Sequence, residues 1–116
     1  MEKTYKFNTI PTVEDIIKLY NAAGLARPTH DPERMLKMYQ NSNLVYTAWN
    51  GEHLAGACRC ITDWVWCCYL SDLVVDPEFK KCGIGKSLIR YTKEKLGEQS
   101  MILLLSVPDA MGITST

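Results

Sequence analysis

The sequence has no long apolar run. Its longest uninterrupted apolar stretch covers residues 64–70, whereas a membrane-spanning helix needs about 20 residues. The first residues, Met1-Glu2-Lys3-Thr4-Tyr5, contain no apolar core of the kind that a secretion signal requires. We therefore expect a cytoplasmic protein with no membrane partner. The 116 residues are 47% hydrophobic and 22% charged, which predicts one globular domain, 1–116.

Net charge is also missing. Lys plus Arg and Asp plus Glu each number 13, so the formal charge is zero. A balanced chain is a poor general binder of polyanions, and we expect no nucleic-acid partner. The distribution is less even, because residues 80–95 hold six of the 13 basic groups and only one acidic group, Glu94. This segment is either an anion-attracting patch or a solvated helix face.

Cysteine pairs with the spacing of metal ligands are absent. The five cysteines include no C-x-x-C pair, and His30 and His53 are not spaced as ligands. An odd number of cysteines without a secretion signal indicates reduced cytoplasmic thiols. We therefore expect no metal site.

Hydrophobic periodicity and turn residues predict the order β-α-α-β-β-β-α-β. Thr12 and Asp31-Pro32 are typical helix starts, and Gly24 is a typical helix end. Asn50-Gly51 predicts a hairpin. The expected strands cover residues 5–10, 44–49, 52–61, 64–75 and 101–105. The predicted fold is α/β (α+β), with a mixed, mainly antiparallel sheet, flanking helices and one β-α-β crossover at the end.

The most informative segment joins the strand that ends at Val75 to a helix, through Gly83 and Gly85. Glycine lets a backbone approach a ligand closely, and the N–H groups of a helix start attract anions. Two phosphate motifs are excluded. A P-loop needs glycine where this chain has Lys80, and a dinucleotide fingerprint needs glycine where it has Leu88.

The segment resembles the acetyl-CoA signature of the GNAT superfamily of N-acetyltransferases. Residues 69–77 match the strand of that signature, and Lys80-Lys81-Cys82-Gly83-Ile84-Gly85 matches its loop. Lys80 stands where Arg or Gln is usual, which keeps the charge of Arg but loses its bidentate geometry. The resemblance implies acetyl transfer from acetyl-CoA to a small-molecule or peptide amine by direct attack on the thioester. The cofactor-binding residues that it implies are Leu73, Val74, Val75, Lys80, Lys81, Cys82, Gly83, Ile84, Gly85, Lys86 and Ser87.

The sequence departs from the family after residue 105. GNAT domains usually continue with a further helix and two strands, and the helix often supplies a tyrosine that protonates the leaving thiolate. Residues 106–116 match none of this, so we expect a C-terminally incomplete domain. An uncovered apolar strand recruits partners, which predicts a homodimer through the C-terminal strand. An alternative function is a truncated domain that binds CoA but is catalytically weak or inactive. A further alternative is an interaction protein whose glycine turn is only a corner.

The sequence offers fewer candidates for catalytic groups than for cofactor-binding residues. Asp72 precedes the cofactor segment and is either a general base or a hydrogen-bonding strand carboxylate. Tyr69 and Tyr91 are proton donors or core residues. Trp64 and Trp66 share a face of the expected strand, where they pack in the core or line an acceptor pocket. The other candidates are His53, expected at the surface, and Cys82 as an acetyl carrier, which direct attack makes unnecessary.

Overall fold

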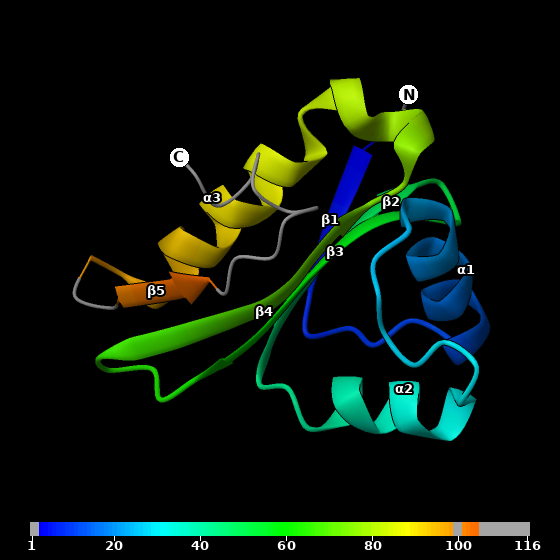
Figure 1. Cartoon of the computed structure of the whole chain (residues 1–116). Coiled ribbons are helices and arrows are strands. Elements are labelled where there is room, and N and C mark those ends of the chain that lie inside the picture. The colour runs from blue at the N-terminus through cyan, green and yellow to red at the C-terminus, as the bar shows by residue number, and fades with distance from the viewer. Residues whose placement is uncertain (1–2, 99–100, 105–116) are drawn as a thin grey trace.

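The centre of the molecule is a five-stranded sheet in the order β1-β2-β3-β4-β5 (Figure 1). The structure, a computed structural model, describes residues 3–98 and 101–104. The strands are β1 (Lys3–Phe7), β2 (Leu44–Asn50), β3 (His53–Thr62), β4 (Cys67–Val75) and β5 (Met101–Leu104). The first four are antiparallel and β5 runs parallel to β4, as the sequence predicts.

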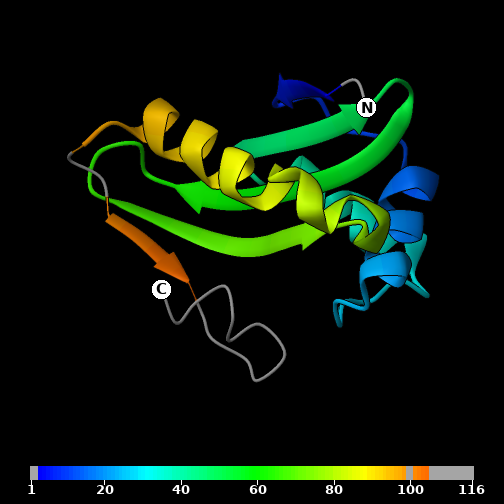
Figure 2. The ribbon, with the colours of Figure 1, turned by 90° about the horizontal axis from the view of Figure 1, so that it is seen from above.

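Helices cover both faces of the sheet (Figure 2). α1 (Val13–Ala23) and α2 (Pro32–Gln40) lie on one face, and α3 (Ile84–Leu96) lies on the other. A short 3-10 helix, η1 (Pro77–Cys82), connects β4 to α3. Among the described residues, no helix is long and apolar enough to cross a membrane. The order of elements is the predicted one, and it confirms the fold class.

The caps confirm the predicted helix boundaries. The Thr12 hydroxyl accepts the N–H of Asp15, and the Asp31 carboxylate accepts the N–H of Arg34. Gly24 ends α1 in the left-handed conformation, with φ 75°. These contacts satisfy backbone groups that a helix end leaves without partners.

The sheet separates two hydrophobic layers. Side chains of β2, β3 and β4 that face α3 pack on Ile84, Leu88 and Leu96. Those on the opposite face pack on α1 and α2 around Tyr20 and Tyr39. Fully burying one such side chain contributes about 1.5–3 kcal/mol, so both layers hold the sheet in place.

A β-bulge interrupts β4 at Ser71. Arg59 is paired with Asp72 and Cys60 with Leu70, so Ser71 has no direct partner on β3. The extra residue reverses the alternation of side chains along the strand. Leu70 and Leu73 therefore both contact the α3 layer, while Val74 faces α1 and α2.

The predicted start of β4 is wrong. The strand begins at Cys67, because residues 63–66 form a turn around the Asp63 carboxylate. Asp63 Oδ1 accepts the N–H groups of Val65, Trp66 and Cys67 at 2.9, 2.9 and 3.1 Å. Trp64 within this turn has a left-handed backbone, with φ 67°. A side-chain cap therefore overrides the β preference of the tryptophans.

Other strand boundaries shift by a few residues. β1 ends at Phe7 rather than at residue 10, because Asn8 turns the chain with φ 50° and its Oδ1 accepts the N–H of Val45. The β2–β3 hairpin is confirmed, but Asn50 and His53 pair, so the turn residues are Gly51 and Glu52. β5 is the predicted C-terminal strand as far as Leu104. Residues 105–116 lie outside the described part, and the homodimer contact stays a prediction.

Candidate functional site

The outer edge of β4 is only partly paired. β5 pairs with Cys67–Leu70, the half of β4 that precedes the bulge. Residues 71–75 border β3 on one side, and no described strand pairs with their other side. This edge contains the predicted cofactor residues Leu73, Val74 and Val75. An unpaired strand edge presents backbone donors and acceptors to an extended ligand, as in strand addition.

The start of α3 is built to attract an anion. Gly83, with φ 74°, is its N-cap and provides no side-chain hydrogen bond, and the first turn contains no acidic residue. The first helical bond to Gly83 runs from the Ser87 N–H to its carbonyl oxygen at 3.0 Å. The N–H groups of Ile84, Gly85 and Lys86 therefore have no intrahelical acceptor. The helix dipole favours negative charge at these groups.

Two glycines bring this helix start against the sheet. A Cβ atom at Gly85 would lie 3.8 Å from Val75 Cγ2, so the predicted loop and the predicted strand edge are neighbours. A Cβ atom at Gly56 on β3 would lie 2.8 Å from Ile84 Cγ2 and 3.2 Å from the Val74 carbonyl oxygen. Gly56 therefore allows the close approach of α3, a role that no sequence pattern in a single chain reveals.

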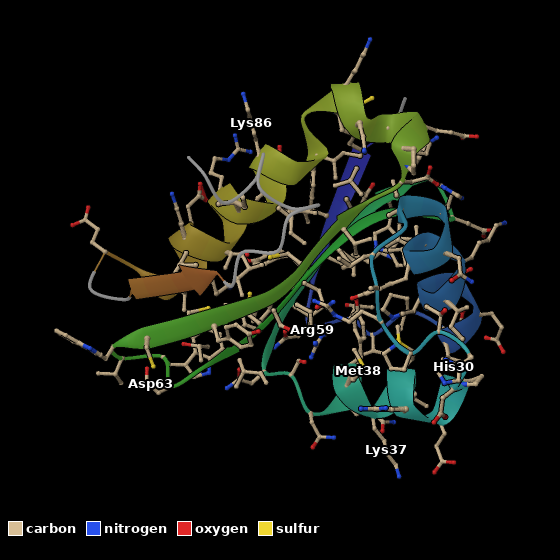
Figure 3. The ribbon with its side chains drawn as sticks, in the orientation of Figure 1. His30, Lys37, Met38, Arg59, Asp63 and Lys86 are labelled. Carbon is tan, nitrogen blue, oxygen red and sulfur yellow. The ribbon has the colours of Figure 1, made fainter. Side chains whose placement is uncertain are left out.

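Basic side chains surround the helix start. Lys80, Lys81 and Lys86 are exposed, and Figure 3 shows Lys86 pointing outward from the beginning of α3. The Lys3 ammonium donates to the carbonyl oxygen of Cys82 at the end of η1. Cys82 itself is half-buried. Cations and free N–H groups thus converge on the loop that the sequence singles out.

Asp76 fixes the beginning of that loop. Its Oδ1 accepts the N–H of Glu78 at 3.0 Å, and its own N–H donates to the Ala55 carbonyl at 2.8 Å. Its Oδ2 lies 3.0 Å from Nε2 of His53. His53 therefore ties the loop to the β2–β3 hairpin. No local pattern in the sequence predicts this contact between Asp76 and His53, which are 23 positions apart.

Asp72 lies in a buried network rather than at an open position. Its Oδ2 accepts hydrogen bonds from Tyr20 Oη at 2.6 Å and from Arg59 Nε at 2.8 Å. Its Oδ1 accepts Arg27 Nε at 2.8 Å and the Ser71 hydroxyl at 3.2 Å. Four donors from α1, the α1–α2 connection, β3 and the bulge therefore meet one carboxylate.

The surroundings of Asp72 stabilise its ionised form. Burial alone would raise its pKa, but the hydrogen bond and the charge of Arg59, with help from Tyr20 and Arg27, lower the pKa below its usual value. Burial raises the pKa of Tyr20, and the nearby Tyr39 and Asp72 raise it further. A carboxylate that is fully engaged and hard to protonate suits the hydrogen-bonding role better than that of a general base.

The structure places the aromatic candidates for proton donation and acceptor binding in three different parts of the molecule. Tyr91 packs between the Tyr5 and Tyr46 rings, with centroid distances of 4.9 and 5.5 Å. Tyr69 lies on β4, directly opposite Ile61 of β3. Trp64 and Trp66 are 40% and 66% exposed, so the expectation that they pack in the core is wrong. They belong to the turn that precedes β4.

Comparisons with known proteins agree with this architecture. The model of the acetyltransferase (GNAT) family matches residues 13–110. A protein from meticillin-resistant Staphylococcus aureus, described as a probable acetyltransferase, is 19% identical, with a TM-score of 0.84 over 98% of this chain and 86% of its own. A GNAT-family acetyltransferase from Streptococcus pneumoniae is 25% identical, with a TM-score of 0.78 over 98% and 84%.

A third structure was solved with a ligand. It is the PaiA N-acetyltransferase from Thermoplasma acidophilum in complex with coenzyme A. It is 16% identical, with a TM-score of 0.73 over 99% of this chain and 86% of its own. A search of curated protein sequences found no match to the chain.

Proposed function

Because the chain belongs to the acetyltransferase (GNAT) family, we propose that it is an N-acetyltransferase that moves an acetyl group from acetyl-CoA to an amine by direct attack on the thioester. The observation that carries this proposal is the contact between an uncapped helix start and an unpaired strand edge, at Gly85 and Val75. The first can hold a pyrophosphate and the second a pantetheine arm. The residues that we assign to this site belong to one GNAT-like domain, residues 1–116, which we expect to be C-terminally incomplete.

The residues present fit acetyl-CoA as the cosubstrate. The N–H groups of Ile84, Gly85 and Lys86 are donors that suit a rigid dianion such as pyrophosphate. The space beside Gly83 is open, because a Cβ atom there would meet nothing within 4 Å. Lys80 and Lys81 add positive charge. The remaining residues that we assign to this site are Leu73, Val74, Val75, Cys82 and Ser87.

Acetyl transfer to an amine requires removal of a proton from the amine and stabilisation of the negative charge that develops on the thioester oxygen. When bound, acetyl-CoA supplies an activated acyl group. An aliphatic amine has a pKa near 10.4, so removing its proton at pH 7 costs about 4–5 kcal/mol, and a base or a water relay must take that proton. A backbone N–H on Leu73–Val75 donates to the thioester oxygen as it gains charge. Asp72, with both oxygens engaged, holds the bulge beside this N–H.

The test measures thiol release from acetyl-CoA across a panel of small amines and lysine peptides. We expect amine-dependent release, with an acetylated amine as the second product by mass spectrometry. Tight acetyl-CoA binding without release for any amine would favour the alternative, a domain that binds CoA but does not turn over. Absence of acetyl-CoA binding by calorimetry would refute the proposal altogether.

A further inference from the structure

β3 and β4 run past the ends of α1 and α2, so no described helix covers the far portion of this face of the sheet (Figure 1). A groove lies there. Cys68 and Leu70 face the α3 layer, so Tyr69 faces the opposite side, that of α1 and α2. Ile61 is paired directly with Tyr69 and is 48% exposed. The groove has a volume of about 420 Å³ and is lined by Ile61, Thr62, Asp63, Cys67, Cys68 and Tyr69.

One end of the groove carries a fixed negative charge. Asp63 lies at the β3–β4 turn, beyond the end of α2 (Figure 3). Its Oδ1 accepts three backbone N–H groups, from Val65, Trp66 and Cys67, while its Oδ2 takes part in none of these bonds. The hydrogen bonds lower the pKa of Asp63 to about 2. The turn therefore holds an exposed, ionised carboxylate at a defined position, and none of the described residues that line the groove is basic.

The other end of the groove approaches the unpaired edge of β4. Tyr69 is two residues before the bulge at Ser71, where pairing with β5 stops. Cys67, whose N–H is bound to Asp63, is four residues before Ser71, which is about 13 Å along a strand. The groove is thus apolar in its middle, anionic at one end, and adjacent to the proposed site of acyl transfer at the other.

We propose that this groove selects acceptor amines that carry a second cationic group, namely linear di- and polyamines. The reacting amine lies at the β4 edge, the methylene chain packs on Ile61 and Tyr69, and the remote ammonium pairs with Asp63. The charge complementarity of Asp63 argues for this class over neutral or anionic acceptors. This inference rests on the proposed function only in placing the reacting amine at the β4 edge.

The experiment compares 1,8-diaminooctane with octylamine, two acceptors of equal chain length that differ in the remote ammonium. Each is assayed with wild type and Asp63→Asn, because the asparagine keeps an Oδ1 that accepts the three N–H groups of the turn. Glu33→Gln on α2 removes the same charge from an exposed residue outside the groove. We expect a diamine preference in kcat/KM that Asp63→Asn reduces about two- to fivefold, the effect of an exposed ion pair.

A binding measurement separates this inference from the proposed function. Trp64 and Trp66 lie in the turn that Asp63 caps and are exposed, so their fluorescence reports titration with either amine. Asp63-dependent binding of 1,8-diaminooctane, with or without turnover, supports the inference. Equal behaviour of the two amines, or a diamine preference that Asp63→Asn leaves unchanged, overturns it even if acetyl transfer is observed. A preference that Glu33→Gln reduces as much as Asp63→Asn does also overturns it.

Discussion

Replacing Gly85 with alanine tests the proposed anion site without damaging the fold. Gly85 lies in the first turn of α3 and has no positive φ angle. The added Cβ atom would lie 3.8 Å from Val75 Cγ2, which is ordinary van der Waals contact. Because alanine is favoured over glycine in a helix by about 0.5–1 kcal/mol, we expect the variant to be as stable as wild type or slightly more stable.

The same methyl group is expected to weaken acetyl-CoA binding. It lies beside one of the N–H groups that we assign to the pyrophosphate, at the junction with β4. Loss of one hydrogen bond to a charged group costs about 1.5–3 kcal/mol. Since 1.4 kcal/mol corresponds to a factor of ten, we expect Kd to rise by about 10- to 150-fold. The larger side chain of Gly85→Val is expected to raise it at least as far.

Calorimetry with acetyl-CoA and thermal unfolding of the free protein are measured on the same samples. Gly56→Ala is the comparison for stability, because its Cβ atom would lie 2.8 Å from Ile84 Cγ2 and 3.2 Å from the Val74 carbonyl oxygen, so the contact between β3 and α3 must shift. We expect that variant to lose stability and Gly85→Ala to keep it. Unchanged acetyl-CoA affinity in both Gly85 variants would refute the assignment of the anion site to the start of α3.

Two further perturbations address the buried network and the loop. Asp72→Asn leaves Arg27 and Arg59 without a buried counter-ion, so we expect a loss of about 3–5 kcal/mol in the free energy of unfolding by urea at pH 7. The folded pKa of Asp72 is lowered, so its contribution is present above the unfolded pKa near 3.9 and is lost as the pH falls through the folded pKa. The difference in the free energy of unfolding between wild type and Asp72→Asn should therefore become smaller as the pH falls. A difference that stays constant with pH would contradict this prediction. Separately, acetyl-CoA should slow alkylation of Cys82 by iodoacetamide, followed by peptide mass spectrometry, while the exposed Cys67 reacts at an unchanged rate. Equal protection of both thiols would argue against binding at the loop.

Local signals predicted the helices and the loop well. Thr12, Asp31 and Gly24 act through contacts with residues no more than four positions away, so the chain itself specifies them. The Gly83/Gly85 turn is equally local, because it needs only a strand, a left-handed residue and a helix start. For this reason the order of elements could be predicted from the sequence. The position of the anion site rests on the same kind of local pattern and stays a proposal.

Features that depend on distant residues could not be derived in this way. Three of the four hydrogen-bond donors to Asp72 lie 13, 45 and 52 positions away, and no periodicity reveals them. Gly56 looks like an ordinary strand glycine until α3 is placed on it. The tryptophans at 64 and 66 carry a strong β preference, which the three hydrogen bonds to Asp63 override. The groove beside that turn was consequently missed.

The buried charges and the open edge of β4 have a common physical explanation. A bulge leaves one residue of a strand outside the ladder. Here Arg27 Nη2 donates to the carbonyl oxygen of Ser71 at 3.0 Å, and Arg59 Nη2 donates to the Ser71 hydroxyl oxygen at 2.9 Å. Asp72, at the next position, forms an ion pair with each of the two guanidinium groups. Pairing with β5 reaches only Leu70, the residue before this cluster. Desolvating three charges is costly unless they are paired and hydrogen-bonded. Each nitrogen of the two guanidinium groups has at least one hydrogen-bond partner. The network thereby holds β4 in a shape that leaves the outer edge of residues 71–75 without a partner among the described strands.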